Sequence, residues 1–215
     1  SRGYTAADSE YPLLTTVNGL SDHIGLEGST SGGNGSCLLQ NVLLMHLIRS
    51  TATMADEMGD TEYAASLRER FETMKDSWNR AFVDEATGMT LNRNLSTGEL
   101  QELSLGDVSN VYIDTQSTYA YALYYDIVSD TMTITEGENA GMTYADFFAK
   151  RLSEIVADPS ICGAGRGPRP NSSFVLASGG PYTASGKPYT ITTGFAATPS
   201  ILPALTKTGN NEAAY

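Results

Sequence analysis

The chain has 215 residues, of which 40% are hydrophobic and 18% charged, a composition typical of a globular protein and not of a disordered one. Its formal net charge of −12 comes from 13 basic and 25 acidic side chains. Such a surface repels phosphate backbones and anionic lipids, so we expect no nucleic-acid or membrane partner. A neutral oligosaccharide is compatible with this charge. No stretch of about 18 apolar residues occurs, so no transmembrane helix is expected.

The first 36 residues are rich in Gly, Ser and Thr and are predicted to be mostly irregular. They begin with Ser1–Tyr4, which has no apolar signal core, so we expect any targeting segment to lie outside this sequence. The Gly-rich stretch Gly28–Gly35 lacks a Lys and a preceding strand pattern, which argues against a nucleotide-binding loop.

A helix is predicted from about Ser36 to Met58, followed by a second from about Thr61 to Phe82. Apolar residues go nearly all the way round the first helix, which is typical of a helix buried on all sides. These residues are Leu38, Leu39, Val42, Leu43, Leu44, Met45, Leu47 and Ile48. Gly59-Asp60 separates the two helices, with Asp60 as the predicted N-cap.

The second helix has one apolar stripe at spacings of three and four residues, which predicts an amphipathic helix. The stripe consists of Tyr63, Leu67, Phe71, Met74, Trp78 and Phe82. On or beside the opposite face lie Arg68, Glu69, Arg70, Asp76 and Asn79. A helix buried all round and then an amphipathic one together indicate a hairpin with an inner and an outer helix.

The same alternation repeats after a predicted loop over residues 83–113. Asp114 or Thr115 is expected to cap a helix that continues to about Val128. The aromatic residues within 119–125 are interpreted as core rather than as a sugar platform. An amphipathic helix follows from about Thr143 to Ala157, with its apolar residues on one side.

A Gly-, Pro- and Ser-rich segment over residues 158–189 is too long for an ordinary connection. A β-branched run, a turn at Gly194 and a helix start at Thr198-Pro199 follow, because Thr can cap a helix and Pro fits its first position. Asn210 begins a partner helix. The chain therefore contains two complete helical hairpins and most of a third, a unit that needs neighbours to bury its inner face.

The cysteines and sequons leave two questions open. Cys37 is interpreted as a small core residue, although a disulfide between Cys37 and Cys162 is also compatible with the sequence. Neither cysteine has metal-ligand spacing, and we expect no metal or cofactor. Three sequons, at Asn34, Asn94 and Asn171, are close to the roughly two expected by chance, so the compartment stays open.

Several segments resemble the catalytic domain of α-L-rhamnosidases. Thr190–Leu205 is similar to the family segment TTGFxGTPxLLPxL, and Gly209–Tyr215 to the GRxDLAY that follows it. Two departures are Ala197, where the family usually has Gly, and Thr190, where it often has His. Trp78–Gly88 resembles FNxxFxDxxTG, and Asp114–Leu123 resembles TQTAYAL. These matches occur in the family's order.

This resemblance implies an all-α fold, a partial (α/α)6 toroid of the six-hairpin glycosidase type comprising about half of the barrel. Residues 1–215 would form one partial catalytic-barrel domain, with an irregular loop region over 1–36 and helical hairpins over 37–215. The implied reaction is the removal of terminal α-L-rhamnose with inversion. The family's acid lies upstream of the matched region and its base is a Glu downstream, so no catalytic residue is expected within this chain, which is interpreted as a fragment.

The resemblance also suggests substrate-binding residues. Ser21-Asp22-His23 lies where the family has Gly-Asp-Trp or a similar triplet. Asp22 is therefore predicted to accept hydrogen bonds from sugar hydroxyls, and His23, which replaces the usual aromatic residue, to donate one. Gln116 is a third candidate, with packing at the start of the inner helix as its alternative role. We expect Asp22, His23 and the loop before Thr193 to cluster at one end of the inner helices.

Two other functions remain open at this point: a different six-hairpin carbohydrate enzyme, and a non-catalytic helical-repeat module that holds a partner on its concave face. A partial ring would also expose apolar sides of its inner helices. We therefore expect self-association of the 215-residue chain.

Overall fold

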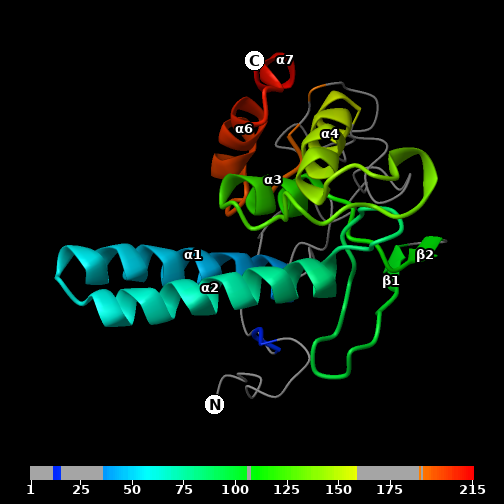
Figure 1. The fold of residues 1–215 in the computed structure, drawn as a ribbon. Helices are drawn as coiled ribbons and strands as arrows, with labels where there is room; N and C mark the ends of the chain where they lie inside the picture. The colour runs from blue at the N-terminus through cyan, green and yellow to red at the C-terminus, as the bar shows by residue number, and fades with distance from the viewer. Residues whose placement is uncertain (1–11, 16–35, 106–107, 159–188, 190) are drawn as a thin grey trace, which may run out of the picture.

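The computed structural model describes residues 12–15, 36–105, 108–158, 189 and 191–215. Its first hairpin consists of α1 (Ser36–Glu57) and α2 (Thr61–Phe82), which pack side by side along their length (Figure 1). The Asp60 carboxylate accepts a hydrogen bond from the Tyr63 backbone N–H at 3.1 Å, as expected for an N-cap. Both helices were predicted within a residue of their observed ends.

The amphipathic character of α2 is confirmed, with two exceptions. Leu67, Phe71, Met74, Trp78 and Phe82 are buried against the core, whereas Tyr63 near the solvent end of the hairpin is 50% exposed. The prediction that Asn79 lies on or beside the polar face is wrong, because Asn79 is buried. Its amide donates to the Ile127 backbone carbonyl at 2.9 Å and accepts from the Ser129 N–H at 2.8 Å. Asn79 thus provides polar partners for the chain that leaves the next inner helix.

The segment between α2 and the next helix is not a plain loop. It contains a two-stranded antiparallel hairpin, β1 (Leu103–Leu105) and β2 (Val108–Asn110), in which Ser104 pairs with Ser109. Isolated bridges join Val83 to Thr90, Leu91 to Tyr112 and Arg93 to Leu100. The sequence did not predict these strands because three residues show too little alternation to be recognised.

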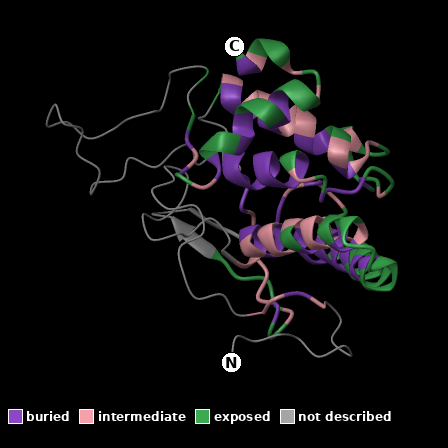
Figure 2. Cartoon of the chain, turned by 90° about the vertical axis from the view of Figure 1, so that its left-hand side faces the viewer, coloured by how far each residue is buried: buried purple, intermediate pink, exposed green. Residues whose placement is uncertain are grey.

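The second hairpin consists of α3 (Gln116–Tyr124) and α4 (Tyr144–Ala157), joined by a connection that contains the short 3-10 helix η1 (Gly137–Asn139). The side chains of Thr115 and Thr143 cap α3 and α4, respectively. Every residue of α3 from Gln116 to Leu123 is buried, so the prediction of an inner helix is confirmed (Figure 2).

This inner helix is shorter than predicted. It ends at Tyr124 instead of continuing to about Val128. Asp126 has a φ of +57°, a left-handed conformation that ends a right-handed helix. The Ile127 N–H donates to the Ala122 carbonyl at 2.9 Å and closes the helix end. The exposed Asp126 carboxylate also forms ion pairs with Arg49 of α1 and Lys207 of α6.

The third pair consists of α6 (Thr198–Lys207) and α7 (Asn211–Ala214). The prediction that Thr198 is the N-cap is wrong, because Ala197 occupies that position and Thr198 is already helical. The Thr198 hydroxyl instead donates to the Gly194 carbonyl at 2.7 Å, which fixes the preceding turn.

The contacts between helices define two layers. α3 packs against α1 on one side and α6 on the other, whereas α4 covers α3 and also contacts α6 and α7. The inner helices are therefore α1, α3 and α6, and their outer partners are α2, α4 and α7 (Figure 1). This arrangement confirms the all-α fold of successive inner and outer helices, with the small β1–β2 hairpin as an addition.

The two ends of this inner row are partly uncovered. On α1, Leu47 is 61% exposed, so the expectation of burial on all sides does not hold for this flank. A groove of about 280 Å³ lies beside it, lined by Leu14, Leu39, Gln40, Leu43, Leu44, Leu47 and Tyr121. On α6, Leu202 is 45% exposed beside a second groove of about 360 Å³. Among the described residues, no helix packs over either flank.

No helix in the described part of the chain has the length and apolar character needed to cross a bilayer.

The substitution Gly88→Ala is expected to destabilise the fold, and Gly98→Ala provides a matched control. Both glycines have a φ near +78°, so alanine is strained by roughly 1–2 kcal/mol at either position. A Cβ at Gly88 would lie 2.5 Å from Ile134 Cδ1 and 2.7 Å from Phe147 Cδ1, whereas a Cβ at Gly98 meets nothing within 4 Å. We expect Gly88→Ala to lower the free energy of unfolding by about 1–3 kcal/mol more than Gly98→Ala in urea titrations. Equal losses would contradict this packing.

Candidate functional site

A buried ion pair lies at the start of α3. The Asp114 carboxylate is fully buried and accepts hydrogen bonds from the Tyr119 hydroxyl at 2.6 Å and from Arg151 Nε at 3.0 Å. Arg151 Nη2 contacts the second carboxylate oxygen, and Nη1 lies 3.4 Å from Glu154 Oε2. Because Arg151 and Glu154 belong to α4, this network fastens the start of an inner helix to its outer partner.

The network fixes the charges of its members. Burial raises the pKa of Tyr119 well above its usual value, and the adjacent negative charge of Asp114 raises it further. For Arg151, burial acts to lower the pKa, but the hydrogen bond and charge of Asp114 outweigh it and the net pKa is raised. Tyr119 is thus a neutral donor and Arg151 a permanent cation. Removing one partner of such a buried ion pair lowers the free energy of unfolding by about 3–5 kcal/mol. Asp114 therefore has a positioning role: it holds Arg151 and Tyr119 in place.

Gln116, in the first turn of α3, joins three elements. Its side chain is buried; Oε1 accepts from the Thr192 N–H at 3.0 Å and Nε2 donates to the Ile155 carbonyl at 3.2 Å. The structure therefore brings Gln116 together with the segment before Thr193 and with the last turns of α4. A direct contact between Gln116 and a sugar stays a prediction, as do the roles of Asp22 and His23, which lie outside the described residues.

The turn before α6 presents an aromatic ring. The Thr193 and Thr198 hydroxyls lie 2.9 Å apart, and together with the bond from Thr198 to Gly194 they close the turn. Phe195 at its apex is 73% exposed. Sequence reasoning did not single out Phe195, although an aromatic residue directly after a turn glycine is a recognisable signal. It also missed the Asp114–Arg151 pair, which joins residues 37 positions apart and leaves no local pattern.

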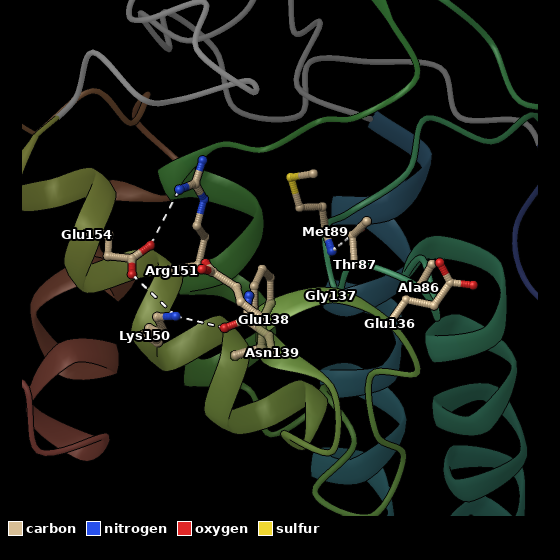
Figure 3. A pocket seen from close by; sticks show the side chains of 11 residues that line it. Ala86, Thr87, Met89, Glu136, Gly137, Glu138, Asn139, Lys150, Arg151 and Glu154 are labelled. Carbon is tan, nitrogen blue, oxygen red and sulfur yellow. Dashed lines mark hydrogen bonds and ion pairs between the residues drawn. The ribbon is translucent and has the colours of Figure 1, made fainter.

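A cavity of about 590 Å³ opens between α4 and two connections, residues 86–89 and 136–139 (Figure 3). Arg151 and Glu154 contribute to its wall, so the cavity adjoins the network at the start of α3. Lys150 donates to Asn139 Oδ1 at 2.7 Å and lies 3.8 Å from Glu154 Oε1. In the part of the chain that is described, no group of three or more His, Cys, Asp or Glu side chains is arranged to hold a metal ion.

Successive inner and outer helical hairpins, with polar side chains gathered where the inner helices α3 and α6 begin, define part of a helical-hairpin toroid. Residues 5–149 match the family described as the bacterial alpha-L-rhamnosidase 6 hairpin glycosidase domain. Since this match covers more than half of the sequence, the chain belongs to that family. The prediction made from the motifs is confirmed at this level.

Three solved structures share the fold. The native α-L-rhamnosidase of Aspergillus terreus aligns over 99% of this chain with a TM-score of 0.60 and 17% identity. The Streptomyces avermitilis enzyme, crystallised with L-rhamnose, aligns over 93% with a TM-score of 0.54 and 20% identity. The α-L-rhamnosidase from Dictyoglumus thermophilum aligns over 94% with a TM-score of 0.56 and 16% identity. The chain spans 18%, 13% and 16% of their respective lengths. No curated protein matches the chain.

The buried Tyr119 hydroxyl makes stability dependent on pH in the alkaline range. The pKa of Tyr119 is raised in the folded state relative to about 10 in the unfolded chain. The stabilisation of the folded state by the neutral Tyr119 hydroxyl is therefore fully present below about pH 10 and is lost as the pH rises further. We expect the free energy of unfolding to fall above about pH 10, and Tyr119→Phe to reduce that fall. Urea titrations between pH 8 and 11 measure the effect. The control Tyr63→Phe, at an exposed position, should show the same pH dependence as the unmodified chain. The same pH dependence for Tyr119→Phe would contradict the role assigned to the Tyr119 hydroxyl.

Proposed function

We propose that this chain forms part of the catalytic domain of an inverting glycoside hydrolase that removes terminal α-L-rhamnose from glycosides or oligosaccharides. The observation that carries the proposal is the match of residues 5–149 to the six-hairpin rhamnosidase domain. The Streptomyces avermitilis relative, which shares the fold, was crystallised with L-rhamnose, and this supports the choice of sugar.

The start of the inner helices is well suited to hold a sugar-binding rim. Asp114, Arg151 and Gln116 connect the beginning of α3 to α4 and to Thr192 in the segment before α6 through hydrogen bonds. Rigid support of this kind fixes the loops that carry binding residues. We place the exposed Phe195 ring at this rim as a surface on which one face of the sugar stacks. Asp22 and His23 are proposed to form hydrogen bonds with the hydroxyl groups of the same sugar.

The acid and the base are proposed to come from segments other than these 215 residues. An inverting pair needs two carboxyl groups that both reach the substrate and lie roughly 6.5–9.5 Å apart. At the start of α3, the Asp114 carboxylate is fully buried and is already engaged by Arg151 and Tyr119. It is therefore unsuited to exchange a proton with a glycosidic oxygen or a water molecule.

The pure 215-residue chain is expected to release no 4-nitrophenol from 4-nitrophenyl α-L-rhamnopyranoside, because a proton donor and a base are both required. A polypeptide that also carries the remaining hairpins should hydrolyse this substrate and release β-L-rhamnose first. Absorbance at 400 nm measures turnover, and the anomeric proton signals in the first minutes report the stereochemistry. Turnover by the chain alone would contradict the placement of the carboxylates, and α-L-rhamnose as first product would exclude inversion.

A further inference from the structure

The helix α1 exposes an apolar stripe on the side that no helix of the described chain covers. Leu43 and Leu47 are followed along it by Met54 and by Met58, whose N–H bonds to the Met54 carbonyl at 3.1 Å. Their spacings of four, seven and four residues place the four side chains on one face of the helix. Leu43 is partly buried, whereas the other three are each more than half exposed, and Met58 is 85% exposed. A contiguous apolar patch of this kind marks an interaction surface.

The stripe is free of charge, although the chain as a whole carries −12. From Ser36 to Met54, Arg49 is the only Lys, Arg, Asp or Glu in the sequence. Its guanidinium lies 5.4 Å from the centre of the Phe71 ring of α2, on the side away from the stripe. Asp56 likewise pairs with Arg68 of α2. Since the centres of protein interfaces are depleted of charged residues, this face can approach another copy of the same acidic chain.

The stripe is its own counterpart under a two-fold axis. Positions 43, 47, 54 and 58 are symmetric about their midpoint. In an antiparallel pair of α1 helices centred on that midpoint, Leu47 faces Met54 of the second copy and Leu43 faces Met58. Each apolar side chain therefore meets an apolar one over a length of about 22 Å, at 1.5 Å per residue. A face that complements itself in this way is what a symmetric pair requires.

The midpoint of the stripe is occupied by the small residues Ser50 and Thr51. Small side chains at a crossing point let two helices approach within the roughly 8–10 Å typical of packed helices. The Thr51 hydroxyl donates to the Leu47 carbonyl at 2.8 Å, so it keeps a hydrogen bond when water is removed from this face. Close contact of two α1 helices here therefore leaves this polar group satisfied.

The groove at the base of α1 receives the tip of the second copy. It has a volume of about 280 Å³, and Leu39, Leu43, Leu47 and Tyr121 are among its lining residues. Figure 1 shows that the α1–α2 hairpin projects beyond α3, so its tip can reach a second molecule. In the antiparallel pair, Met58 of one copy lies opposite the groove of the other. The flexible, unbranched Met side chain is suited to fill such an irregular apolar space.

We propose that two copies of this chain form a symmetric dimer through antiparallel α1 helices, with Met58 of each copy in the groove of the other. The contact uses the same face of both molecules, so it closes at two copies. The contact is small for a protein interface, and we expect a Kd in the micromolar range. The dimer goes beyond the proposed function, because it does not depend on the reaction or on the sugar.

The test is multi-angle light scattering of the 215-residue chain over a wide range of concentration. We expect the mass to rise from one copy and to level off at two. Leu47→Glu alone and Met54→Lys alone should each hold the mass at one copy, because a charge then lies in the apolar seam. Both positions are exposed, so the variants keep the fold. Leu202→Glu, at an exposed position on α6, is the matched control and should dimerise as the unmodified chain does.

A mixture of the two α1 variants makes the test specific for the antiparallel register. Equal amounts of Leu47→Glu and Met54→Lys should restore the mass of two copies, because the introduced carboxylate and ammonium group face each other across the axis. A mixture that stays at one copy would overturn the proposal, as would a constant mass of one copy for the unmodified chain. A mass beyond two copies, or loss of the dimer in Leu202→Glu, would instead indicate a head-to-tail contact between α1 and α6 and would also overturn it.

Discussion

The architecture depends on the burial of α3, a helix that has no polar face. All residues from Gln116 to Leu123 are buried, which is possible only because α1, α6 and α4 pack around the helix. Tyr119, for example, packs its ring edge-to-face with Phe148 of α4 at 4.7 Å between centroids. An isolated α3–α4 hairpin would leave the sides of α3 that contact α1 and α6 in water. The requirement for neighbours therefore explains why consecutive hairpins stack and why the inner helices form one row.

Burying a helix start creates a second requirement, because its backbone and side-chain polar groups lose water. The chain meets it with Thr115, which caps α3, with Gln116, which bonds to Thr192 and Ile155, and with the Asp114–Arg151 pair. These partners come from α4 and from the segment before α6. The groups that make burial possible are thus the same groups that hold the rim where the substrate is proposed to bind, so folding and site geometry rest on one set of contacts.

The sequence predicted what local periodicity and capping determine. The bounds of α1, α2 and α4 follow from apolar spacing and from caps such as Asp60 and Thr143. It failed where tertiary partners decide. Asn79 looks like a surface residue until Ile127 and Ser129 are placed beside it. The early end of α3, where Asp126 adopts a left-handed conformation, is followed directly by these two contacts with Asn79. For the candidate site, the motif indicated the importance of the segment before Thr193. Phe195 follows a turn glycine and was recognisable but not singled out, whereas Arg151 has no local signature because its partner Asp114 lies 37 positions away.

The central claim is that these hairpins are an open arc whose inner row needs further neighbours. The uncovered flanks at Leu47 and Leu202 test it most directly. Multi-angle light scattering of the pure chain at 0.15 M salt, where charge repulsion is screened beyond about 8 Å, should give a mass above the 22.9 kDa of one copy that rises with concentration. The double variant Leu47→Lys/Leu202→Lys should shift the mass toward one copy. A constant mass of one copy for the unmodified chain at all concentrations would contradict the account.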